Sequence, residues 1–248
     1  MNRQEDASEN GEGGEPVFNT RDVTVLGLGR CGTGLVLSLG EELTKRNDTE
    51  FMVCHSNEFK PEGANNVMSI GWNVSRSIWD EHEFSPREKY DELDELCNMM
   101  ESLTFGTNVF ILAVGAGGMF GSYVAGKISE FFSPSWAKMI AFVVMPFAGE
   151  GEKRNNDAKV CVADLQRFCD VVVIVSNHRL LENRPTETLG SAFARVDGLF
   201  AQMVRKVIDA RGHEGIDFVL EDPDGLSEVH INMNPRRDED REHGKVYD

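Results

Sequence analysis

Two glycine-rich segments, each directly after a run of apolar residues, constrain this chain more than any other feature. The first, residues 27–34, reads Gly-Leu-Gly-Arg-Cys-Gly-Thr-Gly. The second, residues 115–122, reads Gly-Ala-Gly-Gly-Met-Phe-Gly-Ser. Glycines at such positions let a strand turn sharply into a helix whose first N–H groups point outward, where the helix dipole favours an anion. Two of these junctions in one chain predict a polyphosphate ligand that is bound from two sides.

Short apolar runs rich in β-branched residues alternate along the chain with longer amphipathic segments. We expect strands at 22–28, 51–55, 108–114, 139–145 and 171–176. We expect helices at 31–46, 88–103, 119–132, 156–168 and 187–210. This alternation is typical of a doubly wound α/β fold, in which a mostly parallel sheet carries helices on both faces. Ligands of that class bind at the carboxyl edge of the sheet.

The composition suggests one main domain with charged ends. Residues 1–20 are rich in glycine and glutamate and predict a disordered acidic arm. We expect one nucleotide-binding domain over residues 21–225 and a charged tail over residues 226–248. The segment 187–210 carries apolar residues on more than one helical face, which indicates that it packs against the sheet and against a further partner. The five cysteines include no C-x-x-C pair, which argues against a disulfide framework or a zinc site, so no metal ligands are assigned.

The charge of the chain limits its partners. The formal net charge is −17, from 42 acidic and 25 basic residues. Non-specific binding of nucleic acid needs a basic surface, so the composition argues against it. An anionic ligand must be held by local N–H groups and a few cations against the field of the whole protein. No apolar run has the length of a membrane span and no signal pattern occurs at the N-terminus, so we expect a cytoplasmic protein without direct membrane insertion.

The first glycine segment by itself permits a different function. Residues 27–32 match G-x-G-x-x-G, the fingerprint of dinucleotide-binding folds, so an NAD-binding oxidoreductase is one alternative. That fold places an acidic residue at the end of its second strand. Here residues 53–57 read Val-Cys-His-Ser-Asn, and Glu58 lies beyond them. The dinucleotide fold also gives no role to the second glycine segment.

Further motifs follow in a fixed order. Residues 143–154 read Val-Val-Met-Pro-Phe-Ala-Gly-Glu-Gly-Glu-Lys-Arg, and residues 171–182 read Val-Val-Val-Ile-Val-Ser-Asn-His-Arg-Leu-Leu-Glu. Residues 192–197 read Ala-Phe-Ala-Arg-Val-Asp. With the two glycine segments, this order resembles the FtsZ/tubulin superfamily, particularly FtsZ and its archaeal relatives, from about residue 22 to about residue 225. The corresponding family patterns are G-G-G-T-G-[ST]-G, K-P-F-x-x-E-G-x-x-R, I-V-I-P-N-D-R-L-L-E and A-F-x-x-A-D.

The resemblance implies a site for GTP or GDP, with an accompanying Mg2+ left open. Backbone N–H groups of the first segment would line the phosphates, at Gly27, Gly29, Arg30 and Cys31. The second segment would wrap the β- and γ-phosphates, through Gly115, Gly117, Gly118, Gly121 and Ser122. Glu150 would accept from ribose hydroxyls, Arg154 would approach the sugar-phosphate side, and Asn177 would reach ribose or base. Phe193 would stack on the base, and Asp197 would accept hydrogen bonds from guanine N1–H and N2–H.

Departures from the family pattern leave the activity open. Phe120 stands where the family has a phosphate-binding threonine, and Met119 and Tyr123 replace glycines. In the acidic loop that the family uses for hydrolysis, Asp217 matches the first acid, whereas Leu220 falls at the second. The family also continues into a second domain, which we expect to be absent here. The function is therefore a weak GTPase linked to a prokaryotic cytoskeleton or cell division, or a non-hydrolysing module that binds another copy or a full-length FtsZ-like protein.

Overall fold

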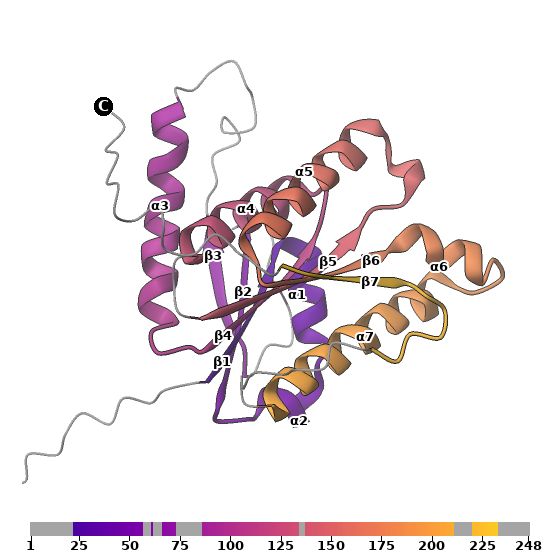
Figure 1. The fold of residues 1–248 in the computed structure, drawn as a ribbon, viewed down its shortest axis with the longest axis horizontal. Helices are drawn as coiled ribbons and strands as arrows, with labels where there is room; N and C mark the ends of the chain where they lie inside the picture. The colour runs from indigo at the N-terminus through magenta and orange to yellow at the C-terminus, as the bar shows by residue number, and fades with distance from the viewer. Residues whose placement is uncertain are drawn as a thin grey trace, which may run out of the picture.

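A seven-stranded sheet organises the part of the chain that the structure, a computed structural model, describes: residues 22–56, 61, 66–72, 86–133, 137–210 and 220–232. The spatial order is β3-β2-β1-β4-β5-β6-β7, in which β7 alone runs antiparallel to its neighbour (Figure 1). The strands are β1 (Val23–Leu28), β2 (Thr49–Ser56), β3 (Met68–Trp72), β4 (Val109–Gly115), β5 (Lys138–Met145), β6 (Val171–Ser176) and β7 (Ser227–Ile231).

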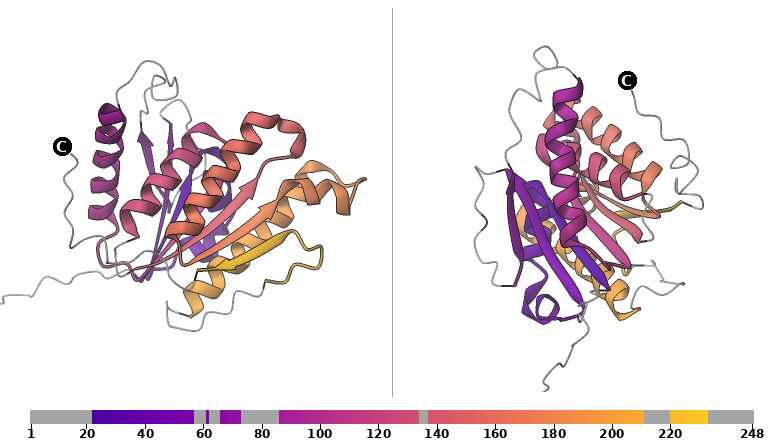
Figure 2. Two further views of the ribbon diagram at one scale, coloured as in Figure 1. Left: turned by 45° about the horizontal axis from the view of Figure 1, so that its top comes forward. Right: turned by 90° about the vertical axis from the view of Figure 1, so that its left-hand side faces the viewer.

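Helices connect the strands and cover both faces of the sheet. They are α1 (Gly29–Leu37), α2 (Gly40–Thr44), α3 (Pro86–Leu103), α4 (Met119–Phe132), the short 3-10 helix η2 (Ala148–Glu150), α5 (Glu152–Phe168), α6 (Asn177–Asn183) and α7 (Leu189–Asp209). Figure 2 shows α3, α4 and α5 on one face and α1, α2 and α7 on the other. The mostly parallel α/β fold expected from the sequence is confirmed.

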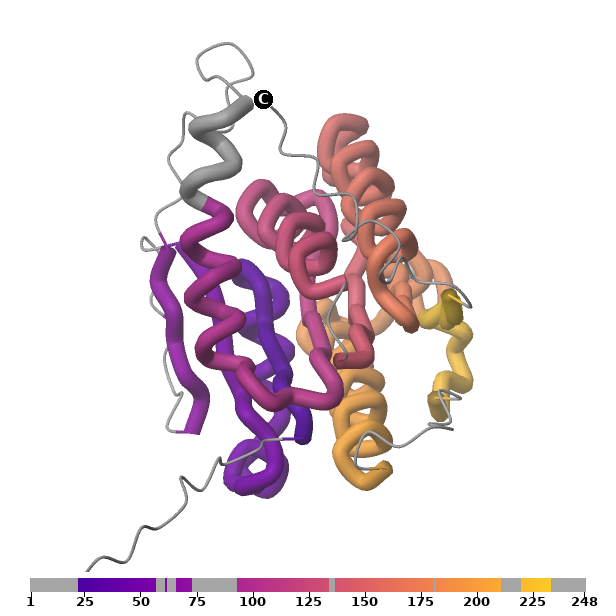
Figure 3. Tube along the Cα trace, turned by 60° about the vertical axis from the view of Figure 1, so that its left-hand side comes forward, coloured from indigo at the N-terminus to yellow at the C-terminus, as the bar shows by residue number. Residues whose placement is uncertain are grey.

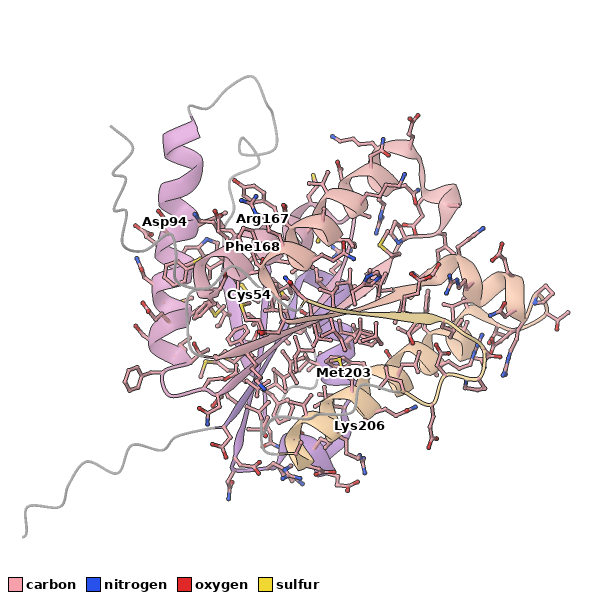
Figure 4. The ribbon with its side chains drawn as sticks, viewed as in Figure 1. Cys54, Asp94, Arg167, Phe168, Met203 and Lys206 are labelled. Carbon is pink, nitrogen blue, oxygen red and sulfur yellow. The ribbon has the colours of Figure 1, made fainter. Side chains whose placement is uncertain are left out.

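Two apolar layers, one on each face, form the core. Alternate residues of the buried strands point to opposite faces, as strand geometry requires. Val25 and Ile111 pack with α1 and α7, whereas Leu26 and Leu112 pack with α3, α4 and α5. Figure 4 labels one member of each layer: Met203, from α7, belongs to the first layer and Cys54, from β2, to the second. The central strands are buried on both faces, which explains their nearly continuous apolar sequence.

Several boundaries differ from the sequence-based expectation. The five expected strands are present, but β3, β7 and α6 were not predicted. The expected helix at 31–46 is two helices, because Gly40 adopts a positive φ of 73°, a conformation that ends α1 and restarts the chain as α2. The first of these begins at Gly29 and not at residue 31, so the anion-facing end of the helix lies deeper in the glycine segment.

The end of the domain also needs correction. Leu226 is 2% exposed, and Ser227–Ile231 pairs with β6, so the sheet includes part of the range 226–248 that was predicted as a charged tail. The sequence did not indicate this strand because it is short and has no continuous apolar run. The predicted acidic arm at 1–20 and residues 233–248 lie outside the described residues.

Helix α7 buries one broad face and not two. Its buried residues all pack on the sheet side: Ala192, Val196, Leu199, Phe200, Met203, Val204, Val207 and Ile208. The exposed large apolar side chains on this helix are Leu189 and Phe193, both at its N-terminal end. The second apolar face expected for residues 187–210 is therefore confined to the end of the helix that lies nearest the carboxyl edge of the sheet.

No helix among the described residues is both long enough and apolar enough to cross a bilayer.

Candidate nucleotide site

Helices begin at the carboxyl edge of the sheet directly after four neighbouring parallel strands. β1 leads into α1, β4 into α4, β5 through η2 into α5, and β6 into α6. The first turns of α1 and α4 have no side-chain cap, so their leading N–H groups are not satisfied by a cap residue. Such helix ends carry partial positive charge, which makes this edge suited to an anion.

The first junction is packed so closely that only glycine fits at two positions. A Cβ on Gly27 would lie 2.3 Å from the carbonyl oxygen of Gly32, and a Cβ on Gly32 would lie 2.0 Å from that of Ala113. These contacts are between backbone atoms, so no side-chain rotation could relieve them. Gly29 opens α1 with a positive φ of 66°. The glycines therefore bring the start of α1 directly against β1 and β4.

The two glycine segments are in contact with each other. A Cβ on Gly29 would lie 3.3 Å from the Cα and the backbone nitrogen of Gly121, near the start of α4. A Cβ on Gly115 would lie 2.5 Å from the Cβ of Cys31. The start of α1 and the start of α4 therefore lie side by side. A single polyphosphate bound at this edge would therefore reach both.

The second segment uses some of its own hydrogen-bonding groups internally. The backbone N–H of Gly117 donates to the hydroxyl oxygen of Ser122 over 2.8 Å, and the N–H of Ala116 donates to the carbonyl of Val144 over 2.9 Å. The hydroxyl oxygen of Ser122 is therefore engaged within the loop. Phe120 packs against the apolar layer under α3, α4 and α5.

The start of α5 closes the edge on the other side of the second segment. Gly117, with a positive φ of 78°, lies so near Arg154 that a Cβ would be 2.4 Å from the Arg154 carbonyl oxygen. The Arg154 guanidinium pairs with the Glu150 carboxylate, with 3.0 Å between Nη1 and Oε2. The other Glu150 oxygen accepts the backbone N–H of Phe147 over 2.7 Å. Glu150 and Arg154 are thus held together beside the second glycine segment.

The far end of the site is apolar with a buried acceptor. Phe193 is 42% exposed, and its ring centroid lies 6.3 Å from that of Phe147. Sequence reasoning did not single out Phe147, although it lies inside the quoted motif 143–154. Asn177 opens α6, and its Oδ1 is buried without a hydrogen-bond partner in the described structure. A buried amide oxygen without a partner costs free energy, so a hydrogen-bond donor that reaches it, from a ligand or a water molecule, would be favourable.

Cys31 is the point at which the separate parts of the site meet. Its side chain is exposed, yet burial by surrounding protein raises the pKa of the thiol to about 11. Exposure and a raised pKa are compatible here, because one side of the Cys31 side chain contacts solvent while its other sides are surrounded by protein. The Asp197 carboxylate raises this pKa further and the Arg154 guanidinium lowers it. Charges on α5 and α7 therefore act on the start of α1, although the three residues are far apart in sequence.

Asp197 itself is an unusual acid. Partial burial raises the pKa of its carboxyl group above the ordinary value for aspartate. Desolvation of this kind disfavours the charged form until a donor approaches it. A ligand that offers N–H groups to this carboxylate would therefore relieve an existing cost, which is typical of binding sites.

Other predicted positions stand as follows. Arg30 is exposed and follows Gly29 in the first turn of α1, and Gly118 is the N-cap of α4. Asp217 lies outside the described residues. Among the described residues no group of three or more His, Cys, Asp and Glu could hold a metal ion. The end of β2 carries His55, whose ring nitrogens lie 2.9 Å from the Ser56 carbonyl and the Ser69 hydroxyl, where a dinucleotide fold would have an acid.

Comparison with protein families gives a match over residues 22–185, to the GTPase domain of the Tubulin/FtsZ family. The cell division protein FtsZ of Methanothermobacter thermautotrophicus is 27% identical over 242 residues, which are 94% of this chain and 62% of that protein. FtsZ 1 of Archaeoglobus fulgidus is 25% identical over 192 residues, which are 75% of this chain and 50% of that protein. The chain thus spans between half and about three fifths of the length of these two relatives.

Solved structures show the same fold. An empty FtsZ dimer from Methanocaldococcus jannaschii superposes with a TM-score of 0.59 at 18% identity, over 79% of this chain and 57% of that one. CetZ from Methanosaeta thermophila gives 0.59 at 19% identity, over 79% and 56%. CetZ2 from Haloferax volcanii, solved as a GTPγS-bound protofilament, gives 0.58 at 16% identity, over 78% and 60%.

Proposed function

The chain belongs to the Tubulin/FtsZ family, and from this premise we propose that the carboxyl edge of its sheet binds a guanine nucleotide, GTP or GDP. The observation that carries the proposal is the contact of the uncapped start of α1 with the start of α4 at Gly29 and Gly121, with Arg154 of α5 against Gly117. N–H donors and a cation that suit phosphates thus lie together. The effect of Asp197 on the pKa of Cys31 indicates that a carboxylate that would suit a base lies nearby.

The phosphates would lie against the uncapped starts of α1 and α4. Their contact at Gly29 and Gly121 gives one continuous set of N–H donors, and Arg154 adds a cation nearby. This local positive potential would hold the anion despite the net charge of −17. A Mg2+ ion, where present, would take its ligands largely from phosphate oxygens and water, as this ion usually does in nucleotide sites.

Base selection would depend on Asp197. Guanine presents N1–H and N2–H side by side, and one carboxylate can accept both. Adenine has an acceptor at N1, which would face the carboxylate oxygens unfavourably. The Asn177 Oδ1 would accept a hydrogen bond from ribose or base, and Phe193, whose ring is accessible beside Phe147, would pack on the base.

The family's cell-division members suggest where the protein acts. We place it in a cytoplasmic cytoskeletal or cell-division system of FtsZ type, because the two relatives described above are named cell division proteins. A nucleotide-dependent partner in such a system would be a second copy of this chain or a longer FtsZ-like protein.

A non-hydrolysing interaction module is the second candidate. The Ser122 hydroxyl oxygen accepts the backbone N–H of Gly117, and Phe120 packs into an apolar layer where the family has a threonine. The Gly117 N–H is thereby unavailable to a γ-phosphate, and phenylalanine offers no side-chain donor. This candidate predicts phosphate release at the buffer background, both for the protein alone and for a mixture with a full-length relative. Turnover above that background would favour a weak GTPase.

The proposal is tested by replacing Asp197. Asp197→Ala should remove the preference for GTP over ATP, and Asp197→Asn should do the same because its amide can accept only at one atom. Hydrogen bonds to charged groups contribute about 1.5–3 kcal/mol, so GTP affinity should fall roughly 10- to 100-fold. Asp209→Asn is the matched control, because Asp209 lies on the same helix with a side chain that is 61% exposed.

Competition between GTP and ATP for a fluorescent guanine nucleotide measures the effect, with circular dichroism as the check on folding. Unchanged discrimination in both Asp197 variants would refute the pocket assignment. A protein-dependent change in NADH fluorescence would instead favour the oxidoreductase alternative.

A further inference from the structure

The side chains of strand β7 are mostly exposed, whereas those of its neighbour β6 are mostly buried. Glu228, Val229, His230 and Ile231 are all exposed, with Val229 at 38% and Ile231 at 62%. Figure 3 shows β7, in yellow, at the margin of the molecule, and Figure 1 shows it beside β6. Among the described strands, none pairs with its outer side. A strand open on both faces and along one edge is a template for pairing with another strand.

The hydrogen bonds to β6 fix which backbone groups of β7 point outward. The N–H of Asn232 donates to the Asp170 carbonyl, and the N–H of Ser176 donates to the Leu226 carbonyl. In an antiparallel pair, residues alternate between bonding the neighbour and pointing away from it. Residues 226, 228, 230 and 232 therefore bond to β6, and the N–H and C=O groups of Ser227, Val229 and Ile231 point away from the sheet.

The side chains of β7 are sorted by face. Val229 and Ile231 lie opposite Val173 and Val171, on the α7 side of the sheet. Glu228 and His230 lie on the other face. The strand contains no lysine, proline or bulge of the kinds that usually protect an edge. It is also held in place before any partner arrives, because Glu228 pairs with Arg179 over 2.6 Å and Asn232 donates to the Gln166 carbonyl over 3.0 Å.

We propose that β7 is a dimerisation edge, on which the β7 strand of a second copy of this chain pairs antiparallel about a two-fold axis at Val229. In this register Val229 lies opposite the partner's Val229, and Ser227 lies opposite the partner's Ile231. The Val229 pair exchanges two backbone hydrogen bonds, because both of its members point outward. In each Ser227–Ile231 pair the Ile231 N–H donates to the Ser227 carbonyl, whereas the Ser227 N–H already donates to the Asp222 carboxylate over 2.6 Å within its own chain. The two sheets join into one, and the symmetric contact closes without leaving a further copy of β7 exposed.

The Glu228 carboxylate disfavours a neighbouring register. With the axis at Val229, Glu228 lies opposite the partner's His230, and the two carboxylates are kept apart. An axis at residue 228 would place Glu228 opposite the partner's Glu228, and like charges directly opposite one another destabilise a strand pair.

The test uses cysteine cross-linking, which depends on register and is independent of nucleotide binding. Variants are made in a Cys31→Ser background, because Cys31 is exposed and the other four native cysteines are buried. In Val229→Cys the two Cα atoms would be about 5.5 Å apart, which a disulfide spans. In Ile231→Cys the equivalent residues would be offset by four positions, or about 13 Å, which a disulfide does not span.

The expected result is an oxidised dimer from Val229→Cys, little from Ile231→Cys alone, and a mixed dimer when Ile231→Cys and Ser227→Cys are combined. Sedimentation velocity at high ionic strength, where repulsion between chains of charge −17 is screened, should show a dimer that Val229→Lys converts to monomer. Equal cross-linking of Val229→Cys and Ile231→Cys would overturn the register. A protein that stays monomeric at all concentrations would overturn the proposal.

Discussion

Two glycines on α1 give a matched pair of variants that tests how this site is built. Gly32 and Gly34 lie two positions apart, and both can receive the same change to alanine. A Cβ on Gly32 would lie 2.0 Å from the carbonyl oxygen of Ala113 and 2.9 Å from its carbonyl carbon. A Cβ on Gly34 would meet no atom within 4 Å. The helix and the chemistry are the same, so only the packing differs.

The two substitutions should change the stability of the protein in opposite directions. Gly32→Ala must push the start of α1 away from β4, because backbone atoms on both sides prevent local relief; overpacking of this kind costs about 1–3 kcal/mol or more. Gly34→Ala places alanine at an open helical position, which should stabilise the protein by about 0.5–1 kcal/mol. In a chain of this size 1 kcal/mol shifts the Tm by about 2–4 °C. We expect Gly32→Ala to lower the Tm by about 2–12 °C and Gly34→Ala to raise it by about 1–4 °C.

Thermal melts followed by circular dichroism, on protein freed of nucleotide, measure both shifts in one buffer. Gly32→Ala should also weaken GTP binding, because it displaces the start of α1 from the start of α4. Shifts of equal sign and size in the two variants would refute the packing of α1 on β4 that positions the site.

Three further predictions concern single side chains. Alkylation of Cys31 should rise about tenfold per pH unit up to pH 9 without levelling, because its thiol pKa is about 11, and nucleotide should protect it; mass spectrometry measures both. GTP affinity, by calorimetry, should fall as the pH drops through the raised pKa of Asp197. Asp197→Asn should therefore raise the Tm at pH 7, and this gain should vanish as the pH falls through that pKa. Arg195→Met should lower the Tm, because Arg195 binds two carboxylates, whereas the exposed Arg205→Met should change stability by less than about 0.5 kcal/mol.

The sequence indicated those strands and helices whose buried faces produce a recognisable pattern of apolar residues. β1, β4, β5 and β6 are covered on both faces, so each appears as a run of apolar residues, and α4 begins and ends where its pattern predicts. β3 and β7 lie at the sheet edges with mostly exposed side chains, so nothing in Met-Ser-Ile-Gly-Trp or Ser-Glu-Val-His-Ile marks them as strands. Gly40 shows why helix length was overestimated: its positive φ is a property of the folded backbone.

The residues of the candidate site likewise fall into those that the sequence indicated directly and those that it did not. The glycine segments could be read directly, because only glycine permits the backbone contacts at Gly27 and Gly32. The residues from α5, α6 and α7 could be assigned only through the resemblance. The family match over residues 22–185 confirms the family but ends before α7, and the roles of these residues stay predictions. No spacing rule predicts that Asp197 acts on Cys31, because their proximity depends on how α7 crosses the sheet. The hydrogen bond from the Gly117 N–H to the Ser122 hydroxyl and the contact of Phe147 with Phe193 are likewise consequences of packing.

Calorimetric titration of the unaltered protein with GTP, GDP and ATP tests the central claim most directly. If the edge formed by α1, α4, α5 and α7 is a guanine-nucleotide site, GTP and GDP should bind to a single class of sites. ATP should bind about tenfold more weakly or not at all, since it lacks the donors that Asp197 would accept. Failure of both guanine nucleotides to bind, or equal affinity for ATP, would contradict the account.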